Sequence, residues 1–195
     1  AEHTIAMMLA LSRNISQGDH ELRQNKWNRH LLVGTELRNK TLGIVGLGKI
    51  GREVMSRSLP FGMNILGYDP FVNQKMFNED EIRIVELDEL LEQSDFITIH
   101  VPLNSETKNL FNKDRLKKMK NTARIINVSR GGIINEDDLA RSLIDNEISG
   151  AAIDVFAKEP LDKSNPLINA PNTLLTPHLG ASTEEAKEGV SIAIC

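Results

Sequence analysis

The sequence of 195 residues is poor in the features that mark secreted, membrane and nucleic-acid-binding proteins. Its one cysteine, Cys195, cannot form an internal disulfide and fits a reducing compartment. No apolar run is long enough to span a bilayer, and no signal peptide is visible. The net charge of −4 gives no reason to expect binding to nucleic acid or to an anionic membrane. We therefore expect a cytoplasmic protein without nucleic-acid or membrane partners.

What is present is the composition of an ordinary globular domain. Apolar residues make up 40% of the chain and charged residues 26%, and there is no internal repeat or low-complexity segment. Short apolar runs at 41–45, 64–68, 96–99, 124–128, 150–155 and 173–176 predict strands. Helices are expected near 1–15, 49–58, 86–93, 113–119 and 136–145, the last with Asn135 as its N-cap. Residues 16–40 and 70–84 are polar and are expected to be irregular.

Strands that alternate with helices in this way predict one α/β domain. Because nearly continuous apolar strands must be buried on both sides, the expected fold is a Rossmann-type, doubly wound parallel sheet with helices on both faces. Both ends of the sequence fall inside expected helices. The first is apolar nearly all round, and the last has a possible capping box, Ser182 and Glu185, with an apolar stretch at 190–195. We therefore expect residues 1–195 to be one domain of a longer chain.

The most informative segment is the motif Gly46-x-Gly48-x-x-Gly51, directly after the first predicted strand. Gly46 permits a tight turn, Gly48 lets backbone amides approach a pyrophosphate, and Gly51 lets the next helix pack on the strand. The helix N-terminus then offers free N–H groups to phosphates. Asp69, at the end of the next strand, can accept hydrogen bonds from a ribose 2′-hydroxyl and would repel a 2′-phosphate, which favours NAD over NADP. The alternative is a glycine-rich turn without a ligand.

Ligands of parallel sheets bind beyond the carboxyl ends of the strands, so the residues that follow each strand are candidates. The guanidinium of Arg130 suits a carboxylate or carbonyl oxygen, and His178 can release and take up one proton in each turnover. Glu159 can orient an imidazole and raise its basicity. Each of the three alone also fits a structural role, so the hypothesis depends on their facing one cofactor edge. No metal site is predicted.

These segments resemble the NAD-binding domain of the D-isomer-specific 2-hydroxyacid dehydrogenases. The resemblance covers essentially the whole chain and includes residues 1–4, 26–29, 34–37, 41–51, 67–70, 127–132, 152–156, 159–160 and 177–183. It implies that Arg130 binds the substrate carboxylate and keto oxygen, that His178 is the general acid/base, and that Glu159 is its carboxylate partner. The implied cofactor contacts are the backbone of Lys49 and Ile50 at the pyrophosphate, Asp69 at the adenosine ribose, Asp154 at the nicotinamide carboxamide, and further contacts at Val101, Ser129, Arg130, His178, Gly180 and Ala181.

The function implied by the resemblance is hydride transfer between NAD and a D-2-hydroxy acid. The similarity is greatest to the branch that oxidises 3-phosphoglycerate in serine biosynthesis, and a glyoxylate or hydroxypyruvate reductase is the close alternative. Formate dehydrogenases carry Gln at the position of Glu159 and are set aside. An NAD-sensing corepressor of the same fold, which acts by binding peptides, and an isolated module without activity are the alternatives from other classes.

The resemblance also implies a second domain that is essentially absent here. In this family the cofactor domain is inserted into a smaller substrate domain built from both chain ends. Residues 1–15 and 184–195 correspond to helices that cross between the domains, and the first also resembles a segment that helps to form a dimer. Its apolar face predicts self-association. For the full-length chain we expect a homodimer or a higher homo-oligomer.

Overall fold

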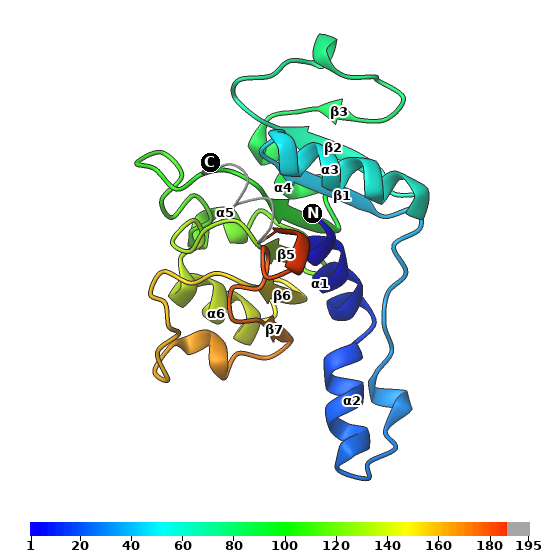
Figure 1. The fold of residues 1–195 in the computed structure, drawn as a ribbon, viewed down its shortest axis with the longest axis vertical. Coiled ribbons are helices and arrows are strands. Elements are labelled where there is room, and N and C mark those ends of the chain that lie inside the picture. The colour runs from blue at the N-terminus through cyan, green and yellow to red at the C-terminus, as the bar shows by residue number, and fades with distance from the viewer. Residues whose placement is uncertain (187–195) are drawn as a thin grey trace.

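The computed structural model describes residues 1–186, which form a seven-stranded, all-parallel sheet in the order β3-β2-β1-β4-β5-β6-β7 (Figure 1). The strands are β1 Thr41–Val45, β2 Asn64–Tyr68, β3 Arg83–Ile84, β4 Phe96–Ile99, β5 Arg124–Asn127, β6 Gly150–Ile153 and β7 Thr173–Leu175. Six of them match the predicted runs to within two residues. The order turns back between β1 and β4, and this reversal is where doubly wound sheets bind their ligands.

Helices cover both faces of the sheet, as expected. They are α1 Glu2–Ser12, α2 Ile15–Arg23, α3 Lys49–Ser58, α4 Leu87–Gln93, α5 Lys113–Leu116 and α6 Glu136–Ile144. Short 3-10 turns lie at Arg29–Leu31, Leu59–Phe61, Gln74–Met76 and Pro166–Ile168. The side chain of Asn135 accepts a hydrogen bond from Asp138 N and so caps α6, as the sequence predicts.

The two faces are packed by different helices. On one face α1 and α3 cover the inner strands, with Met7 and Met8 against Ile44 and Ile126. The helices α4, α5 and α6 cover the other face, which includes Ile97 and Ile125. Residues of β1, β4, β5 and β6 are buried almost without interruption, which is why these strands read as continuous apolar runs. The Rossmann-type, doubly wound arrangement is confirmed.

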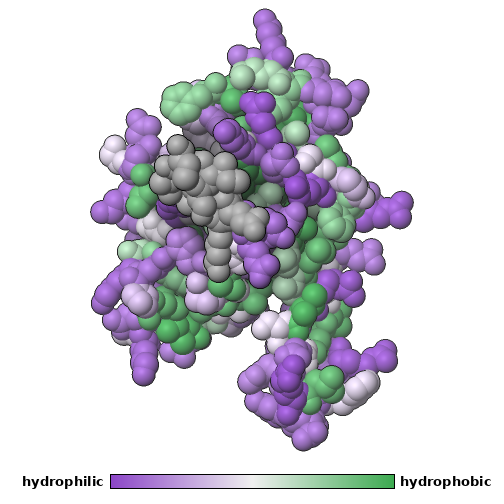
Figure 2. Space-filling view, in the orientation of Figure 1, coloured by the Kyte–Doolittle hydropathy of each residue, from purple (hydrophilic) through white to green (hydrophobic). Residues whose placement is uncertain are grey.

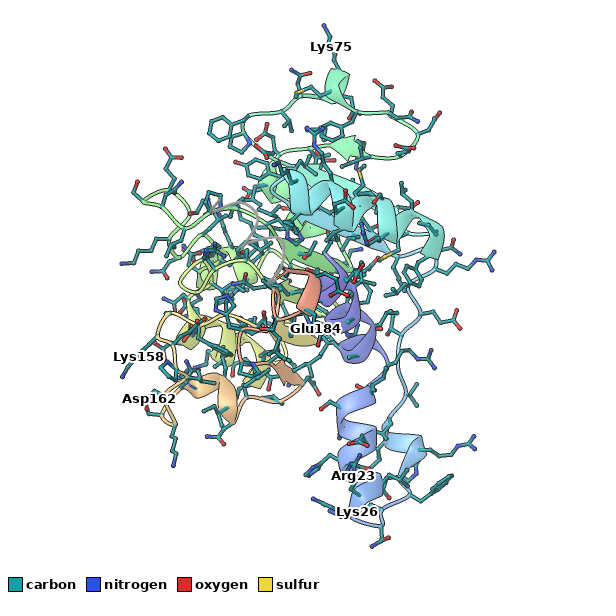
Figure 3. The ribbon with its side chains drawn as sticks, viewed as in Figure 1. Arg23, Lys26, Lys75, Lys158, Asp162 and Glu184 are labelled. Atoms are coloured by element: carbon teal, nitrogen blue, oxygen red, sulfur yellow. The ribbon has the colours of Figure 1, made fainter. Side chains whose placement is uncertain are left out.

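The segment 14–34 forms an arm that projects from the sheet domain (Figure 1), and here the prediction of irregular structure is wrong. It contains α2 and the 3-10 turn at Arg29–Leu31, with Arg23 and Lys26 near its tip (Figure 3). No residue of α2 is buried, and the helix has too few apolar residues to stand out from the polar segment around it. Asn14, in the left-handed region at φ 52°, separates it from α1.

The connection at 70–84 also contains more structure than expected. Its last residues, Arg83 and Ile84, form the edge strand β3, paired in parallel with Leu66 and Gly67 of β2. The side chain of Gln74 supports this strand, because its amide donates to Ile82 O and accepts from Ile84 N. A two-residue strand is too short to show alternation, which explains why the sequence pattern misses it.

The beginning of the last predicted helix differs by one residue from the expected cap. The Oγ1 of Thr183, rather than Ser182, accepts a hydrogen bond from Ala186 N at 3.1 Å, and helical backbone begins at residue 184. The rest of this expected helix, residues 187–195, lies outside the described residues, as does Cys195. Within residues 1–186, no helix is long and apolar enough to cross a membrane.

The first helix is buried on several sides, as its composition predicts. Met7 and Met8 are almost completely buried, while Ala6 and part of Leu9 remain at the surface beside Phe61. The expected exposed apolar face is therefore only a narrow strip on α1. Most of the exposed apolar side chains near it belong to the arm instead, including Ile15, Leu22, Trp27, Leu31 and Val33.

Candidate active site

The glycine motif forms the turn between β1 and α3. Gly46 has a φ of +98°, which disfavours any residue with a Cβ, and such an atom would lie 2.7 Å from the His100 carbonyl. A Cβ on Gly51 would lie only 2.0 Å from the Gly46 oxygen, so this glycine permits the close packing of α3 on the strand. Both roles predicted for these two glycines are confirmed by the geometry.

Gly48 differs from these two glycines because its side-chain position is open. A Cβ placed there would meet no atom within 4 Å. Gly48 is the N-cap of α3, and no side chain caps the helix. The first-turn amides of Lys49, Ile50 and Gly51 therefore have no intrahelical partner and face the open space beyond the strands. This turn leaves a ready site for an anion.

Asp69 follows β2 and is linked to the glycine turn. One carboxylate oxygen accepts a hydrogen bond from Leu47 N at 2.9 Å, and the other accepts from Phe71 N at 3.0 Å. The side chain is partly exposed, so its remaining lone pairs are accessible. Its position beside the turn agrees with the predicted contact to a ribose.

The end of β4 forms the floor of the glycine turn. His100 N donates to Val45 O at 2.7 Å, and Val101 lies against Gly46, where a Cβ would meet its Cγ1 at 2.9 Å. The His100 ring contacts Thr98 Oγ1 at 2.9 Å. Burial lowers the pKa of His100 to about 4, so its imidazole is neutral at physiological pH. We assign it a structural role beneath the turn.

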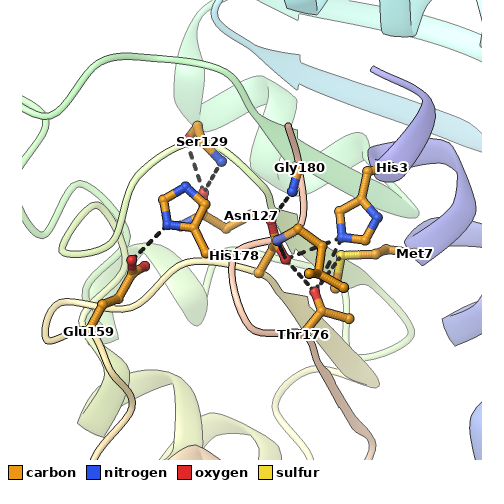
Figure 4. Close-up of polar contacts among 10 residues, drawn as sticks. His3, Met7, Asn127, Ser129, Glu159, Thr176, His178 and Gly180 are labelled. Carbon is orange, nitrogen blue, oxygen red and sulfur yellow. Dashed lines mark hydrogen bonds and ion pairs between the residues drawn. The ribbon is translucent and has the colours of Figure 1, made fainter. Parts of the chain in front are cut away.

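Arg130 is held through its backbone by a buried amide. The Oδ1 of Asn127, the last residue of β5, accepts hydrogen bonds from the backbone N and the Oγ of Ser129 at 3.1 and 2.9 Å (Figure 4). Its Nδ2 donates to Arg130 O at 3.0 Å. The Arg130 side chain is exposed, with its Nη1 donating to Ser129 O. The guanidinium therefore projects from a fixed backbone into open space.

His178 and Glu159 form the pair that the sequence predicts. The Nδ1 of His178 lies 2.7 Å from Glu159 Oε2, and the other carboxylate oxygen accepts from Phe156 N at 2.9 Å (Figure 4). The hydrogen bonds from His178 and from Phe156 hold the pKa of Glu159 below its usual range, so this carboxylate is ionised. Because Glu159 can only accept, the proton lies on Nδ1 and Nε2 is left free to take one.

The turn that carries His178 is fixed by Asp154 at the end of β6. His178 N donates to Asp154 O at 2.8 Å, and the Asp154 carboxylate accepts from Leu179 N at 2.7 Å and from Gly180 N at 2.8 Å. The Asp154 side chain is completely buried. The Asp154 carboxylate already accepts from these two amides, so the predicted hydrogen bond from a nicotinamide carboxamide must use one of its remaining lone pairs. Ala181 follows Gly180 and is exposed.

The parts of the site are brought together by the neighbouring strands β5, β6 and β7. A Cβ on Gly131 would lie 1.9 Å from Phe156 O, so the backbone after Arg130 lies directly against the residue whose amide binds Glu159. An apolar hollow lined by Phe156, Leu161 and Pro177 borders the His178–Glu159 pair. Among residues 1–186, no group of three or more His, Cys, Asp or Glu side chains could hold a metal ion.

Comparison with known proteins agrees with this geometry. Residues 5–180 match the family model described as D-isomer specific 2-hydroxyacid dehydrogenase, NAD binding domain. The chain belongs to this family. It is 50% identical over 194 residues to the D-3-phosphoglycerate dehydrogenase of Synechocystis sp. and 44% identical over 194 residues to that of Bacillus subtilis. These matches cover 100% of this chain but 35% and 37% of those proteins, so the chain spans about a third of their length.

Solved structures of the family have the same fold. The NAD-dependent formate dehydrogenase from Staphylococcus aureus, in complex with NAD, superposes with a TM-score of 0.92 at 35% identity, covering 99% of this chain and 58% of that one. A glyoxylate reductase from Paecilomyes thermophila gives a TM-score of 0.89 at 33% identity, covering 97% and 57%. The cofactor of the family domain is NAD. The open position at Gly48, the uncapped N-terminus of α3 and the accessible carboxylate of Asp69 fit its pyrophosphate and ribose.

Four residues support this site in roles that we did not predict from the sequence, although two of them, His3 and Asn127, lie in segments that resemble the family. Asn127 is a buried polar residue in an otherwise apolar strand, and this signal could have indicated its role. Thr176, which donates to Asp154 Oδ1 at 2.5 Å, also ends an apolar run. His3, on α1, contacts both Asp154 Oδ1 and Thr176 Oγ1, and nothing in the local sequence indicates these contacts. Glu136 accepts from Ala157 N and Asn165 Nδ2 and so ties down the loop that carries Glu159.

Proposed function

We propose that this domain is the cofactor-binding part of a cytoplasmic, NAD-dependent dehydrogenase that interconverts a D-2-hydroxy acid and its 2-keto acid. The preferred substrate in this proposal is 3-phosphoglycerate, the substrate named in relatives that are 41–50% identical over the whole chain. The observation that carries the proposal is the His178–Glu159 pair, which lies at the same sheet edge as Arg130 and the glycine turn.

In the proposed reaction His178 moves the proton. NAD, when bound, supplies the acceptor or donor of the C2 hydride. During oxidation the free Nε2 of His178 takes the proton of the C2 hydroxyl, and in the reverse direction it returns this proton to the keto oxygen. The ionised Glu159 stabilises the resulting imidazolium and keeps Nδ1 protonated.

Arg130 positions the substrate in this proposal. Its fork of N–H donors binds the substrate carboxylate and polarises the C2 oxygen, whose charge changes during the reaction. Asn127 holds the Arg130 carbonyl, so the guanidinium starts from a fixed backbone position. A buried amide that makes three hydrogen bonds reduces the reorganisation needed when substrate arrives.

The cofactor contacts remain as proposed from the resemblance. The turn and the first helical residues bind the pyrophosphate, Asp69 binds the adenosine ribose, and Asp154 reaches the nicotinamide carboxamide. The full proposed set is Gly46, Gly48, Lys49, Ile50, Gly51, Asp69, Val101, Ser129, Arg130, Asp154, His178, Gly180 and Ala181. In this proposal the substrate domain lies outside residues 1–195, and residues 1–15 belong to a segment that crosses between the two domains.

The test is an assay of the full-length protein against a panel of acids. Purified protein is incubated with NADH and phosphohydroxypyruvate, hydroxypyruvate or glyoxylate, and with NAD and 3-phosphoglycerate or formate, while absorbance at the NADH band is followed. We expect the phosphorylated pair to give the highest kcat/KM. In parallel, NADH is titrated against residues 1–195 to test whether this domain binds the cofactor alone.

Each outcome of the panel has a definite meaning. Faster turnover of glyoxylate or hydroxypyruvate would support the proposed dehydrogenase activity but contradict the proposed preference for 3-phosphoglycerate. Turnover of formate alone would overturn the 2-hydroxy acid proposal. Tight NADH binding by the full-length protein without turnover of any of these acids would favour an NAD-dependent binding protein instead.

We also propose that the full-length protein is a homodimer in which the arm contacts a second copy. Trp27 is 76% exposed and Val33 80% exposed, and a projecting segment with such side chains gains stability when another surface covers it. Figure 2 shows hydrophobic side chains among the hydrophilic ones on the arm. The two-fold arrangement is the commonest one for soluble homo-oligomers.

The dimer is tested by light scattering coupled to size-exclusion chromatography of the full-length protein. Trp27→Lys should shift the mass toward the monomer, because a buried cation would destabilise the interface. Phe71→Lys is the matched control, since Phe71 is 86% exposed but lies far from the arm beyond β2. Wild-type protein that is monomeric at micromolar concentration would contradict the proposal.

A further inference from the structure

His3 connects α1 to the end of β6. Its Nε2 lies 3.2 Å from Asp154 Oδ1 and 3.2 Å from Thr176 Oγ1, residues that are 151 and 173 positions away in the sequence (Figure 4). Asp154 is completely buried, whereas the His3 side chain is 22% exposed. The partly exposed His3 therefore contacts a buried carboxylate that itself binds the turn at residues 178–180, which we call the catalytic turn.

The Asp154 carboxylate needs these donors because it is charged. Burial alone would raise its pKa, but the hydrogen bonds from Thr176, Leu179 and Gly180, together with the imidazole of His3, hold the pKa below its usual range. The first three donors are neutral. Among the groups that contact this carboxylate in the described chain, only His3 can carry a positive charge. A buried carboxylate is stable only where hydrogen bonds and opposite charge compensate the lost hydration.

The conformation of the catalytic turn depends on the same carboxylate. His178 has a φ of +56°, in the left-handed region, which is strained for a residue other than glycine. The backbone oxygen of Asp154 accepts from His178 N, and the carboxylate accepts from the next two amides. If Asp154 shifts, the backbone at 178–180 loses the groups that hold it, and the imidazole moves with it.

We propose that His3 is a positioning residue for the reaction, which it supports by fixing Asp154 and through it the turn that carries His178. The inference rests on the proposed role of His178 as general acid/base. Met7 completes the packing around this contact, because its sulfur lies 3.7 Å from Thr176 Oγ1. In this proposal α1 acts on the chemistry through Asp154 and the turn at residues 178–180.

The test compares three variants of the full-length protein. His3→Leu removes the polar contact, and His3→Gln keeps an N–H donor in nearly the same volume. Met8→Leu is the control for packing, since Met8 is a buried residue of the same helix. We expect His3→Leu to lower kcat about tenfold, because small displacements of a catalytic group cost this much or more. His3→Gln keeps the N–H donor but not the charge and should therefore recover part of the lost kcat, and Met8→Leu should retain wild-type kcat.

Two further readouts separate positioning from general stability. With C2-deuterated substrate, the primary isotope effect on kcat should increase in His3→Leu, because the chemical step becomes slower than product release. Amide hydrogen exchange in the peptide containing residues 178–180 should accelerate in His3→Leu but not in Met8→Leu. This second measurement requires no turnover, so it tests the inference even where the proposed activity fails.

The inference is overturned where His3→Leu and Met8→Leu share the same kcat, isotope effect and exchange rate. It is equally overturned where His3→Leu loses activity only in proportion to a lower Tm and His3→Gln gives no rescue. An inactive wild-type protein would contradict the proposed function, while faster exchange at 178–180 in His3→Leu would still support the role of His3 in holding the turn.

Discussion

The two halves of the sheet edge are built in different ways. At the ends of β1 and β2, the site consists mainly of backbone groups and of space that glycines leave open. At the ends of β5, β6 and β7 it consists of side chains held by other side chains, as in the contacts of Glu159 with His178. The first half draws mainly on one short stretch of sequence, whereas the second depends on the packing of distant segments.

This difference explains what each half contributes to the proposed reaction. Backbone amides at a helix N-terminus give a fixed, permanent electrostatic preference for phosphate, independent of pH. The pair at β6 and β7 contains two titratable groups and can exchange a proton. Substitutions in the first half should therefore change cofactor affinity, and those in the second half should change turnover and its pH dependence.

The largest expected effect is that of His178→Ala in the full-length protein. Loss of the general acid/base should lower kcat roughly 10³-fold, within the range found for such groups. Stopped-flow or steady-state assays with NADH measure this directly, and an unchanged Tm would show that the fold is retained. Turnover at the wild-type rate would contradict the assignment of His178.

A smaller effect is expected in the other half for Gly48→Ala. A Cβ at this position meets no protein atom, so the free energy of unfolding should be unchanged within error. The methyl group would nevertheless lie where the pyrophosphate approaches, and loss of one charge-assisted hydrogen bond should weaken NADH binding roughly 30-fold. Fluorescence titration of residues 1–195 measures the affinity.

Gly51→Ala is the matched control in the same motif. Its Cβ would lie 2.0 Å from Gly46 O, so the helix must move and the free energy of unfolding should fall by about 2 kcal/mol. Gly48→Ala thus tests the space that the cofactor needs, and Gly51→Ala tests the packing of α3 on the turn. Equal Tm values for both would show that the turn is more adaptable than its contacts indicate.

The smallest effect is expected for Glu159→Gln. Replacing a charged acceptor by a neutral one should lower kcat about fivefold at neutral pH. Because hydrogen bonds from His178 and Phe156 hold the pKa of Glu159 below its usual range, its charge is present at neutral pH and lost only as the pH falls through that lowered pKa. The ratio of wild-type to variant kcat should therefore stay constant from neutral pH down to that lowered pKa and approach one only below it. A ratio that already approached one at a pH above the usual carboxyl range would contradict this role.

The first half could be predicted from local sequence because its determinants are adjacent. The apolar strand, the glycines at 46, 48 and 51 and the following helix lie within one short stretch, and each has a local physical reason. Six strands were predicted for the same reason, since burial on both faces leaves continuous apolar runs. The edge strand β3 and the exposed helix α2 were missed because neither contains a buried side chain that would leave an apolar pattern in the sequence.

The second half could be predicted only in part. Arg130, Glu159 and His178 each follow a predicted strand, which placed them at one edge, but their individual sequence contexts also fit structural roles. The supporting contacts of His3 and Asn127 depend on which strands become neighbours and on how α1 lies across β5, β6 and β7. Side-chain hydrogen bonds over long separations have no local signature, so the structure was needed to find them.

The contact of Gly131 with the Phe156 carbonyl has a mechanical consequence. It joins the backbone that follows Arg130, the proposed substrate anchor, to the backbone that precedes Glu159, the proposed partner of the base. The two backbones are in such close contact that neither can move toward the other without a clash. A residue larger than glycine at position 131 would push the two loops apart and so displace Arg130 relative to Glu159.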